Sequence, residues 1–130
     1  MRQILFALAA AIAVLVAVPA LAQKTATQFY MDYQAAWSKA TSIESLLPLM
    51  AKENASQVQA TPAAERKEMF EMLKMMNDIK NVKVTKETKT STGYMLEVSG
   101  VGSDKKTVTG TADIVIEGGA MKLKKESWKM

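Results

Sequence analysis

Residues 105–123 read KKTVTGTADIVIEGGAMKL. Up to the glycine pair, apolar or small side chains occupy every second position, which is typical of a β-strand with one buried face. These positions are Val108, Gly110, Ala112, Ile114 and Ile116. Gly118 and Gly119 can supply the positive φ angles of a tight hairpin turn, and Met121 and Leu123 then resume the alternation. The stretch predicts an antiparallel hairpin.

The same alternation begins directly after Asn81. Residues 82–85 alternate, and a second segment has one apolar face formed by Tyr94, Leu96 and Val98. Glycine-containing breaks at 91–93 and 100–104 separate the segments, and we expect their glycines to adopt positive φ in hairpin turns. The pattern predicts four antiparallel strands in a meander, with Gly110 marking a bend.

Before residue 81 the apolar spacing is three and four, which indicates helices. Residues 25–40 carry such a face, formed by Phe29, Tyr33, Ala36, Trp37 and Ala40. Thr41 and Glu44 match a capping box, which predicts a short helix over 42–47. Pro48 is expected to kink or end that helix, because proline lacks a backbone N–H.

The next segment contains a polar stretch and a third helix. Residues 52–59 are aperiodic and are expected to form a loop. Thr61 followed by Pro62 is typical of a helix start, and it predicts a helix over 62–79 that ends at Asn81. Three helices followed by a four-stranded antiparallel meander define an α+β protein, with the helices packed on a curved sheet.

The third helix is rich in methionine: Met69, Met72, Met75 and Met76. On a helical wheel, Met69, Met72 and Met76 share an arc with Leu73 and Ile79, so we expect this arc to be a buried stripe. Phe70 and Met75 widen the arc on its two sides. Either these flanks pack against the neighbouring helices, or one of them lines a pocket or contacts a partner.

The first 22 residues have the pattern of a secretory signal peptide. Residues 4–18 are apolar, a run shorter than the ~20 residues of a membrane-spanning helix. A small-residue motif ends at Ala22, so we expect cleavage between Ala22 and Gln23. Residues 23–130 are then a single secreted domain of the bacterial periplasm. Because the chain has no cysteine to carry a lipid, no stable membrane anchor is expected after cleavage.

Composition excludes several chemistries. The chain has neither histidine nor cysteine, so disulfides, Ser-His-Asp and Cys-His sites are absent, and no metal or cofactor is expected. The net charge of +4 comes from lysines scattered among acidic residues. No basic stripe with interleaved aromatics is visible, and nucleic acid is not an expected partner.

The end of the chain carries a family resemblance. Residues 118–128, GGAMKLKKESW, resemble the ending G-G-x-W-K-I-x-x-E-x-W of small secreted domains in the nuclear transport factor 2-like superfamily, although Met121 replaces the usual aromatic residue. The order of the upstream elements is also similar. The resemblance implies a cone, in which a strongly bent sheet wraps around helices and leaves a pocket at its open end.

Members of that superfamily include isomerases and dehydratases as well as non-catalytic binding modules, and fold alone does not separate them. A ketosteroid-isomerase-like site would need an aspartate base and tyrosine or protonated aspartate donors. Asp32 and Asp113 are the candidate bases here, and the candidate donors are Tyr30, Tyr33 and Tyr94. Neither aspartate matches a family motif, so we name no catalytic residue, and an isomerase- or dehydratase-like enzyme stays an alternative.

A second alternative is a Cu(I) site, because thioether sulfur is a soft ligand and Met69, Met72 and Met76 recur at helical spacing. The missing histidine and cysteine co-ligands favour a core role for these methionines. Asn54, Ala55 and Ser56 match the N-glycosylation pattern, which matters only in a eukaryotic secretory pathway.

The sequence therefore predicts a non-catalytic domain that binds a small apolar molecule or a partner protein, and a homodimer stays open. The pocket candidates are large side chains on faces that should meet inside the cone: Tyr33, Trp37, Phe70, Met72, Met76 and Trp128. Trp128 is also expected to pack and hold the last strand in place.

Overall fold

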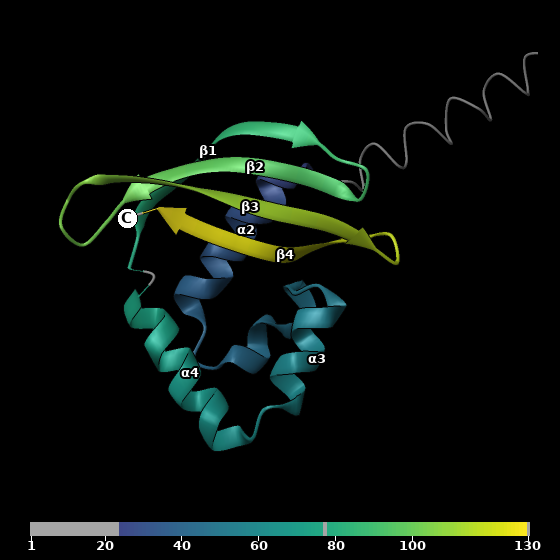
Figure 1. The fold of residues 1–130 in the computed structure, drawn as a ribbon, viewed down its shortest axis with the longest axis vertical. Coiled ribbons are helices and arrows are strands. Elements are labelled where there is room, and N and C mark those ends of the chain that lie inside the picture. Colours follow the sequence, from purple (N-terminus) through teal and green to yellow (C-terminus); the bar gives the residue numbers. More distant parts are fainter. Residues whose placement is uncertain (1–23, 77, 130) are drawn as a thin grey trace, which may run out of the picture.

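The computed structural model describes residues 24–76 and 78–129; the expected signal peptide and its cleavage site at Ala22 and Gln23 lie outside this range. The described chain is an α+β protein with four helical segments and four strands. Figure 1 shows their arrangement. In chain order they are α2 (Ala26–Lys39), the 3₁₀ helix η1 (Ile43–Leu49), α3 (Lys52–Ala60), α4 (Ala63–Met76), β1 (Lys80–Lys89), β2 (Gly93–Val101), β3 (Thr107–Glu117) and β4 (Ala120–Lys129).

The strands form one open antiparallel sheet in the order β1-β2-β3-β4, so the predicted meander is confirmed. Gly118 and Gly119 have φ of 58° and 79°, as the hairpin between β3 and β4 requires. In the other two turns the expectation of positive-φ glycine is wrong. Lys105 takes the positive φ, at 65°, between β2 and β3. Gly93 is needed for space instead, since a Cβ there would lie 2.0 Å from the carbonyl oxygen of Ile114.

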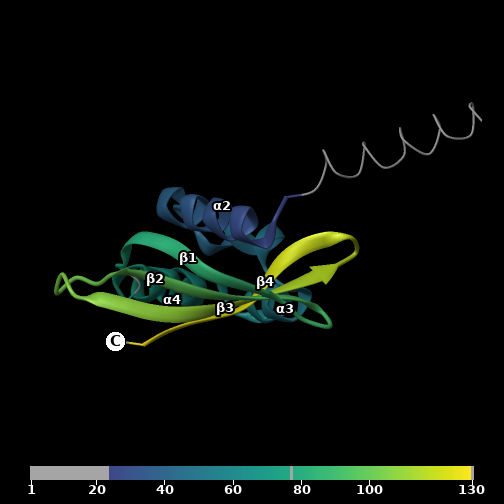
Figure 2. The same cartoon turned by 90° about the horizontal axis from the view of Figure 1, so that it is seen from above.

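Helix α2 lies across one face of the sheet (Figures 1 and 2). Thr25 and Gln28 cap its N-terminus reciprocally in a capping box. Its buried side chains join the inner face of the sheet in the main core, formed by Ala26, Phe29, Tyr30, Tyr33, Leu96, Val98, Ala112, Ile114 and Leu123. Ile116, expected on this face, is 50% exposed, because it lies next to the β3–β4 turn, where the covering elements end.

The remaining helices lie beyond the β4 edge of the sheet (Figure 1). Met50 pairs with Leu123 in a parallel bridge, and the Ala51 amide donates to the Leu123 carbonyl at 2.8 Å. A second cluster fills the space between these helices, formed by Ile43, Leu46, Val58 and Phe70. Because η1 lies along the β4 edge of the sheet, the backbone at this edge is partly covered.

Residues 52–59 form most of helix α3, so the predicted loop is wrong. The helix buries only Val58, which explains why no apolar repeat is visible. Contacts to the sheet hold it instead. The Asn54 amide donates to the Lys124 carbonyl at 2.5 Å, and the Lys52 backbone amide donates to Glu117 at 2.9 Å.

The predicted buried stripe of α4 is wrong at Met72 and Met76, although Met69 and Leu73 do pack against the second cluster. Met72 and Met76 are each 60% exposed, and Met75 is 81% exposed. Phe70 is the buried residue of the helix. Arg66, Met69, Leu73 and Lys74 are half-buried beside it.

Two charged side chains explain this orientation of α4. The Arg66 guanidinium pairs with Glu44 at 3.2 Å, and Lys74 donates to the Trp37 carbonyl at 2.5 Å. Their aliphatic stems therefore lie along the covered side of the helix, and the methionines at 72 and 76 are turned outward. The helix ends at Met76, earlier than predicted, and its last two residues, Met75 and Met76, are exposed.

Three further local predictions are corrected. Glu44 pairs with Arg66, and the Ser42 N-cap of η1 makes no side-chain capping bond, so the capping box at 41–44 is absent. Pro48 lies inside η1, because η1 is a 3₁₀ helix that continues to Leu49. Asn81 lies within β1 at a φ of 54°, beside a register shift, and it bulges the strand instead of ending the helix.

Gly110, predicted to mark a bend, has a packing role. It faces Trp128 across the β3–β4 pair, and a Cβ at this position would lie 3.0 Å from the indole ring. Its missing side chain makes room for Trp128.

No helix in the described ranges is long and apolar enough to cross a membrane.

Candidate functional site

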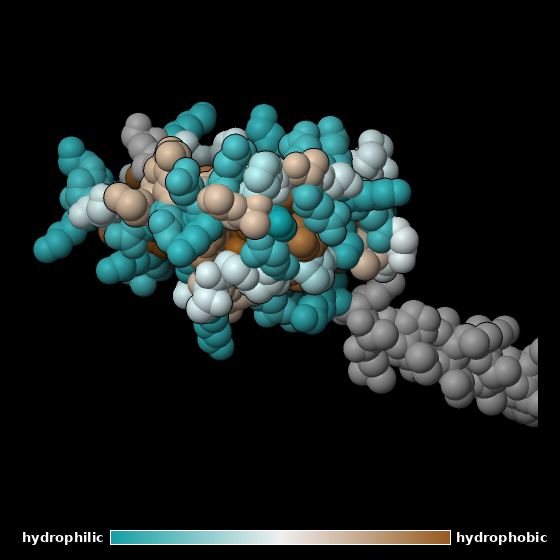
Figure 3. All heavy atoms as spheres, turned by 90° about the horizontal axis from the view of Figure 1, so that it is seen from below, coloured by the Kyte–Doolittle hydropathy of each residue, from teal (hydrophilic) through white to brown (hydrophobic). Residues whose placement is uncertain are grey.

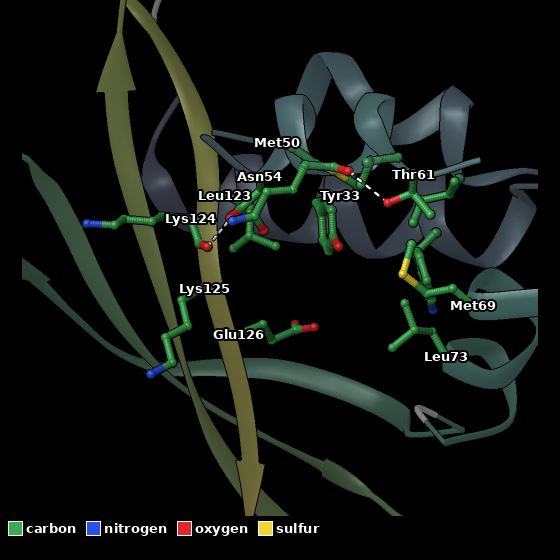
Figure 4. A pocket seen from close by; sticks show the side chains of 14 residues that line it. Tyr33, Met50, Asn54, Thr61, Met69, Leu73, Leu123, Lys124, Lys125 and Glu126 are labelled. Carbon is green, nitrogen blue, oxygen red and sulfur yellow. Dashed lines mark hydrogen bonds between the residues drawn. The ribbon is translucent and has the colours of Figure 1, made fainter. Parts of the chain in front are cut away.

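A cleft of about 430 Å³ lies between the helices and β4. Figure 3 shows apolar side chains visible between hydrophilic ones on the face of the molecule seen from below, and Figure 4 shows the cleft from close by. Its walls are mostly apolar or aromatic. They are formed by Tyr33, Trp37, Ile43, Met50, Asn54, Gln57, Val58, Thr61, Met69, Leu73, Leu123, Lys124, Lys125 and Glu126.

Glu126 enters this wall because β4 contains a bulge. Asp113 pairs with Lys125 but the next residue, Ile114, pairs with Leu123, so Lys124 is an extra residue in β4. Before the bulge Leu123 is buried on the inner face, and after it Glu126 and Trp128 are the half-buried residues. The bulge thus turns a carboxyl group into the interior.

The carboxyl group of Glu126 is held by side chains of α2. The Tyr30 hydroxyl donates to Oε2 of Glu126 in a short hydrogen bond, and Gln34 Nε2 donates to the same oxygen at 2.8 Å. Burial raises the pKa of the Glu126 carboxyl, while Tyr30, Gln34 and Trp128 lower it by hydrogen bonding to the charged form. An ionised carboxylate has about four lone-pair sites, so with Tyr30, Gln34 and Trp128 as donors one site is left for a further donor.

Tyr33 lies beside this group on the cleft wall, and its ring stacks on Tyr30 with centroids 6.4 Å apart. Burial, followed by the negative charge of Glu126, raises the pKa of both Tyr30 and Tyr33 well above the ordinary tyrosine value. Both phenols therefore stay protonated over the physiological range. Figure 4 shows the Glu126 carboxyl pointing into the space between Tyr33 and Leu73.

The six pocket candidates occupy different places. Tyr33 and Trp37 line the cleft. Phe70 packs edge-on against Trp37 at 5.4 Å between centroids, behind the wall. Trp128 packs against the main core. Met72 and Met76 face outward, so they do not contribute to this cleft.

The two aspartates considered as bases lie away from the cleft. Asp32 forms a surface ion pair with Lys24 at 2.6 Å. Asp113 is half-buried, on strand β3 between Met95 and Lys125. Neither lines the cavity, and the residue with the environment of a perturbed acid is Glu126.

The other candidate features can be placed as well. Asn54 Nδ2, the atom to which a glycan would be attached, donates to the Lys124 carbonyl. Within residues 24–76 and 78–129, no group of three His, Cys, Asp or Glu side chains could hold a metal ion. The methionines proposed as Cu(I) ligands do not converge, since Met69 lines the cleft while Met72 and Met76 are exposed.

Sequence reasoning named Tyr30 only as a possible donor to an aspartate and missed Glu126 and Gln34, although a signal was present. Strict alternation from Met121 and Leu123 places residues 125 and 127 on the inner face. Trp128, which was expected to pack, lies out of phase with that alternation. A one-residue bulge between Leu123 and Trp128 reconciles the two expectations, and Glu126 then shares the face of Trp128.

No family model, no curated protein sequence and no solved structure matches this chain. Function is therefore inferred from the cleft itself.

Proposed function

We propose that this protein is a secreted, periplasmic and non-catalytic binding domain of the nuclear transport factor 2-like type. In this proposal the cleft beside Glu126 holds a small apolar ligand. The observation that carries it is the cleft of about 430 Å³ with aromatic and aliphatic walls. Small-molecule sites are typically concave, mainly apolar and supplied with a few polar groups that orient the ligand.

The surroundings of the cleft support a binding role. Its walls come from α2, η1, α3, α4 and β4, together with the adjoining residues Met50 and Thr61. Lining residues on rigid elements position a ligand better than residues on loops. The packing of α2 across one face of the sheet is compatible with a cone whose open end lies at this cleft.

A second cleft of about 460 Å³ must be separated from the first. It lies near the β3–β4 turn and is lined by Lys24, Phe29, Tyr94, Ile116, Gly119, Ala120 and Met121. Among these residues Lys24 is the only ionisable group apart from Tyr94, and Lys24 is paired with Asp32 at the surface. The first cleft has the buried carboxyl in addition, and we place the ligand there.

Titration with N-phenylnaphthylamine, a neutral dye that fluoresces in apolar sites, tests the proposal. We expect saturable binding to the wild-type protein. Leu73→Trp fills the first cleft and should abolish it, whereas Ile116→Trp fills the second and should leave it unchanged. Circular dichroism and thermal unfolding confirm that both variants fold. If the wild type shows no saturable binding, the proposed function is wrong. If only Ile116→Trp loses binding, the ligand occupies the second cleft instead of the first.

A proton-transfer enzyme is a second candidate, favoured by one observation. Glu126 is a carboxyl whose pKa burial raises, and it accepts a hydrogen bond from a buried phenol, a combination found in acid–base sites. Incubation with small cyclic ketones in deuterated water, followed by proton NMR, tests this candidate. Deuterium exchange that disappears in Glu126→Gln supports an enzyme. If the wild-type protein exchanges deuterium into the ketones no faster than buffer alone, the enzyme candidate is wrong.

A further inference from the structure

Among residues 24–76 and 78–129, Glu126 forms no ion pair. The ion pairs among the described residues are Lys24–Asp32, Arg66–Glu44 and Lys86–Glu97, and none includes Glu126. The groups that stabilise its charged form, Tyr30, Gln34 and Trp128, are all neutral. Buried charges in proteins are normally paired or bound to a cation. This carboxyl therefore lies at the cleft wall without a cationic partner among the described residues.

The nearby basic side chains are directed elsewhere. Lys124 and Lys125 adjoin Glu126 in sequence, but Figure 4 shows their amino groups extending away from its carboxyl on the other side of β4. Lys74 donates to the Trp37 carbonyl and lies 5.5 Å from the Trp37 and Phe70 ring centroids. Arg66 is engaged with Glu44. None of these basic side chains therefore supplies a cation to Glu126.

The remaining walls define the rest of the ligand. Leu73, Met69 and Val58 offer an aliphatic surface, while Tyr33 and Trp37 offer aromatic rings, which attract ammonium groups through their π faces. An anionic group beside aromatic rings and an apolar wall suits a molecule with one cationic end and an apolar body.

We propose that the ligand is an apolar amine, whose protonated nitrogen pairs with the Glu126 carboxylate beside the Tyr33 ring while its hydrocarbon part fills the cleft. This inference rests on the proposed binding function and narrows it to one chemical class. The overall charge of the protein, +4, acts in the opposite direction, since long-range attraction would favour anions. A preference for an amine would thus report the local carboxyl and not the net charge.

Calorimetric titration with three probes of equal chain length tests the inference: decylamine, decanol and decanoate, each below its micelle concentration at neutral pH. We expect decylamine to bind about ten- to a hundred-fold tighter than decanol, the range expected of a hydrogen bond to a charged group, and decanoate to bind most weakly. If decanol and decylamine bind equally, the amine proposal is wrong but the apolar cleft stands. If none of the three binds, the proposed function fails as well.

Variants locate the preference. Glu126→Gln keeps the size of the side chain and should reduce decylamine binding to that of decanol, with decanol binding unchanged. Glu97→Gln is the matched control, since Glu97 is exposed and pairs with Lys86; it should keep the full preference. Retention of the amine preference in Glu126→Gln would overturn the assignment. The wild-type comparison of the probes decides the question even if this variant does not fold.

Discussion

The hydroxyl of Tyr30 donates a hydrogen bond to Oε2 of Glu126, which joins helix α2 to strand β4 across 96 positions of sequence. Tyr30 is fully buried, so its phenol needs an internal acceptor. Glu126 provides one and is in turn held at the cleft wall. The pair thus links the packing of the main core to the position of the candidate ligand-binding group.

Tyr30→Phe removes the donor and leaves the ring. We expect it to lower the free energy of unfolding by about 1.5–3 kcal/mol, the range for a hydrogen bond to a charged partner. It should also raise the pKa of Glu126, because one group that stabilises the charged form is lost. Urea unfolding measures the first effect. Tyr94→Phe is the matched control and should change stability by less than about 0.5 kcal/mol; equal losses in both variants would contradict a special Tyr30–Glu126 bond.

Glu126 should make the protein less stable as the pH rises. Burial raises its pKa in the folded state above the unfolded value of 4.5, so the folded chain holds this proton more tightly. Its contribution to stability is fully present below pH 4.5 and is lost as the pH rises through the folded pKa.

Glu126→Gln removes that titration. The stability of the variant relative to the wild type should therefore increase as the pH rises above 4.5, measured by urea unfolding at several pH values. Other carboxyls contribute equally to both proteins and cancel in the difference. A flat difference for Glu126→Gln would mean that the carboxyl is not perturbed by folding.

Gly110→Ala should destabilise the β3–β4 pair. The added Cβ would lie 2.3 Å from the Ser127 carbonyl oxygen and 3.0 Å from the Trp128 ring, so the strand or the indole must move. We expect a loss of about 1–3 kcal/mol, as for other overpacked sites, together with a shift in tryptophan emission. Thr111→Ala, at an exposed position of the same strand, should cost less than about 1 kcal/mol. Equal losses would show that the indole adapts without strain.

The strands were predictable because their signals are local. Alternation at Val108, Ala112 and Ile114 and the Gly118–Gly119 pair depend on nearest neighbours and turn geometry. Helix α2 was predictable from its aromatic spacing for the same reason. Helix α3 was not, since a short polar helix with Val58 as its single buried residue depends on contacts with β4 that lie far away in sequence.

The candidate site was only partly predictable. Tyr33 and Trp37 were found because large aromatic residues on an inward helix face tend to line cavities. Glu126 was missed because its direction depends on the bulge at Lys124, and a one-residue bulge reverses the face of every following side chain. The orientation of α4 was missed for another reason. Its apolar arc spans about 220° on the wheel, wider than one packed face, so the pattern could not say which part is covered.

The covered part of α4 can be measured with a series of alanine variants. Phe70→Ala should cost about 3–5 kcal/mol, because it removes a buried ring that packs on Trp37. Met72→Ala and Met76→Ala should each change the free energy of unfolding by less than about 0.5 kcal/mol, as is usual for exposed positions. Met75→Ala, at the most exposed of the three methionines, serves as the baseline. The methionine stripe expected from the wheel requires the opposite ranking, with about 2–5 kcal/mol lost at positions 72 and 76. Guanidinium unfolding of the four variants therefore decides which side of α4 faces the interior in solution.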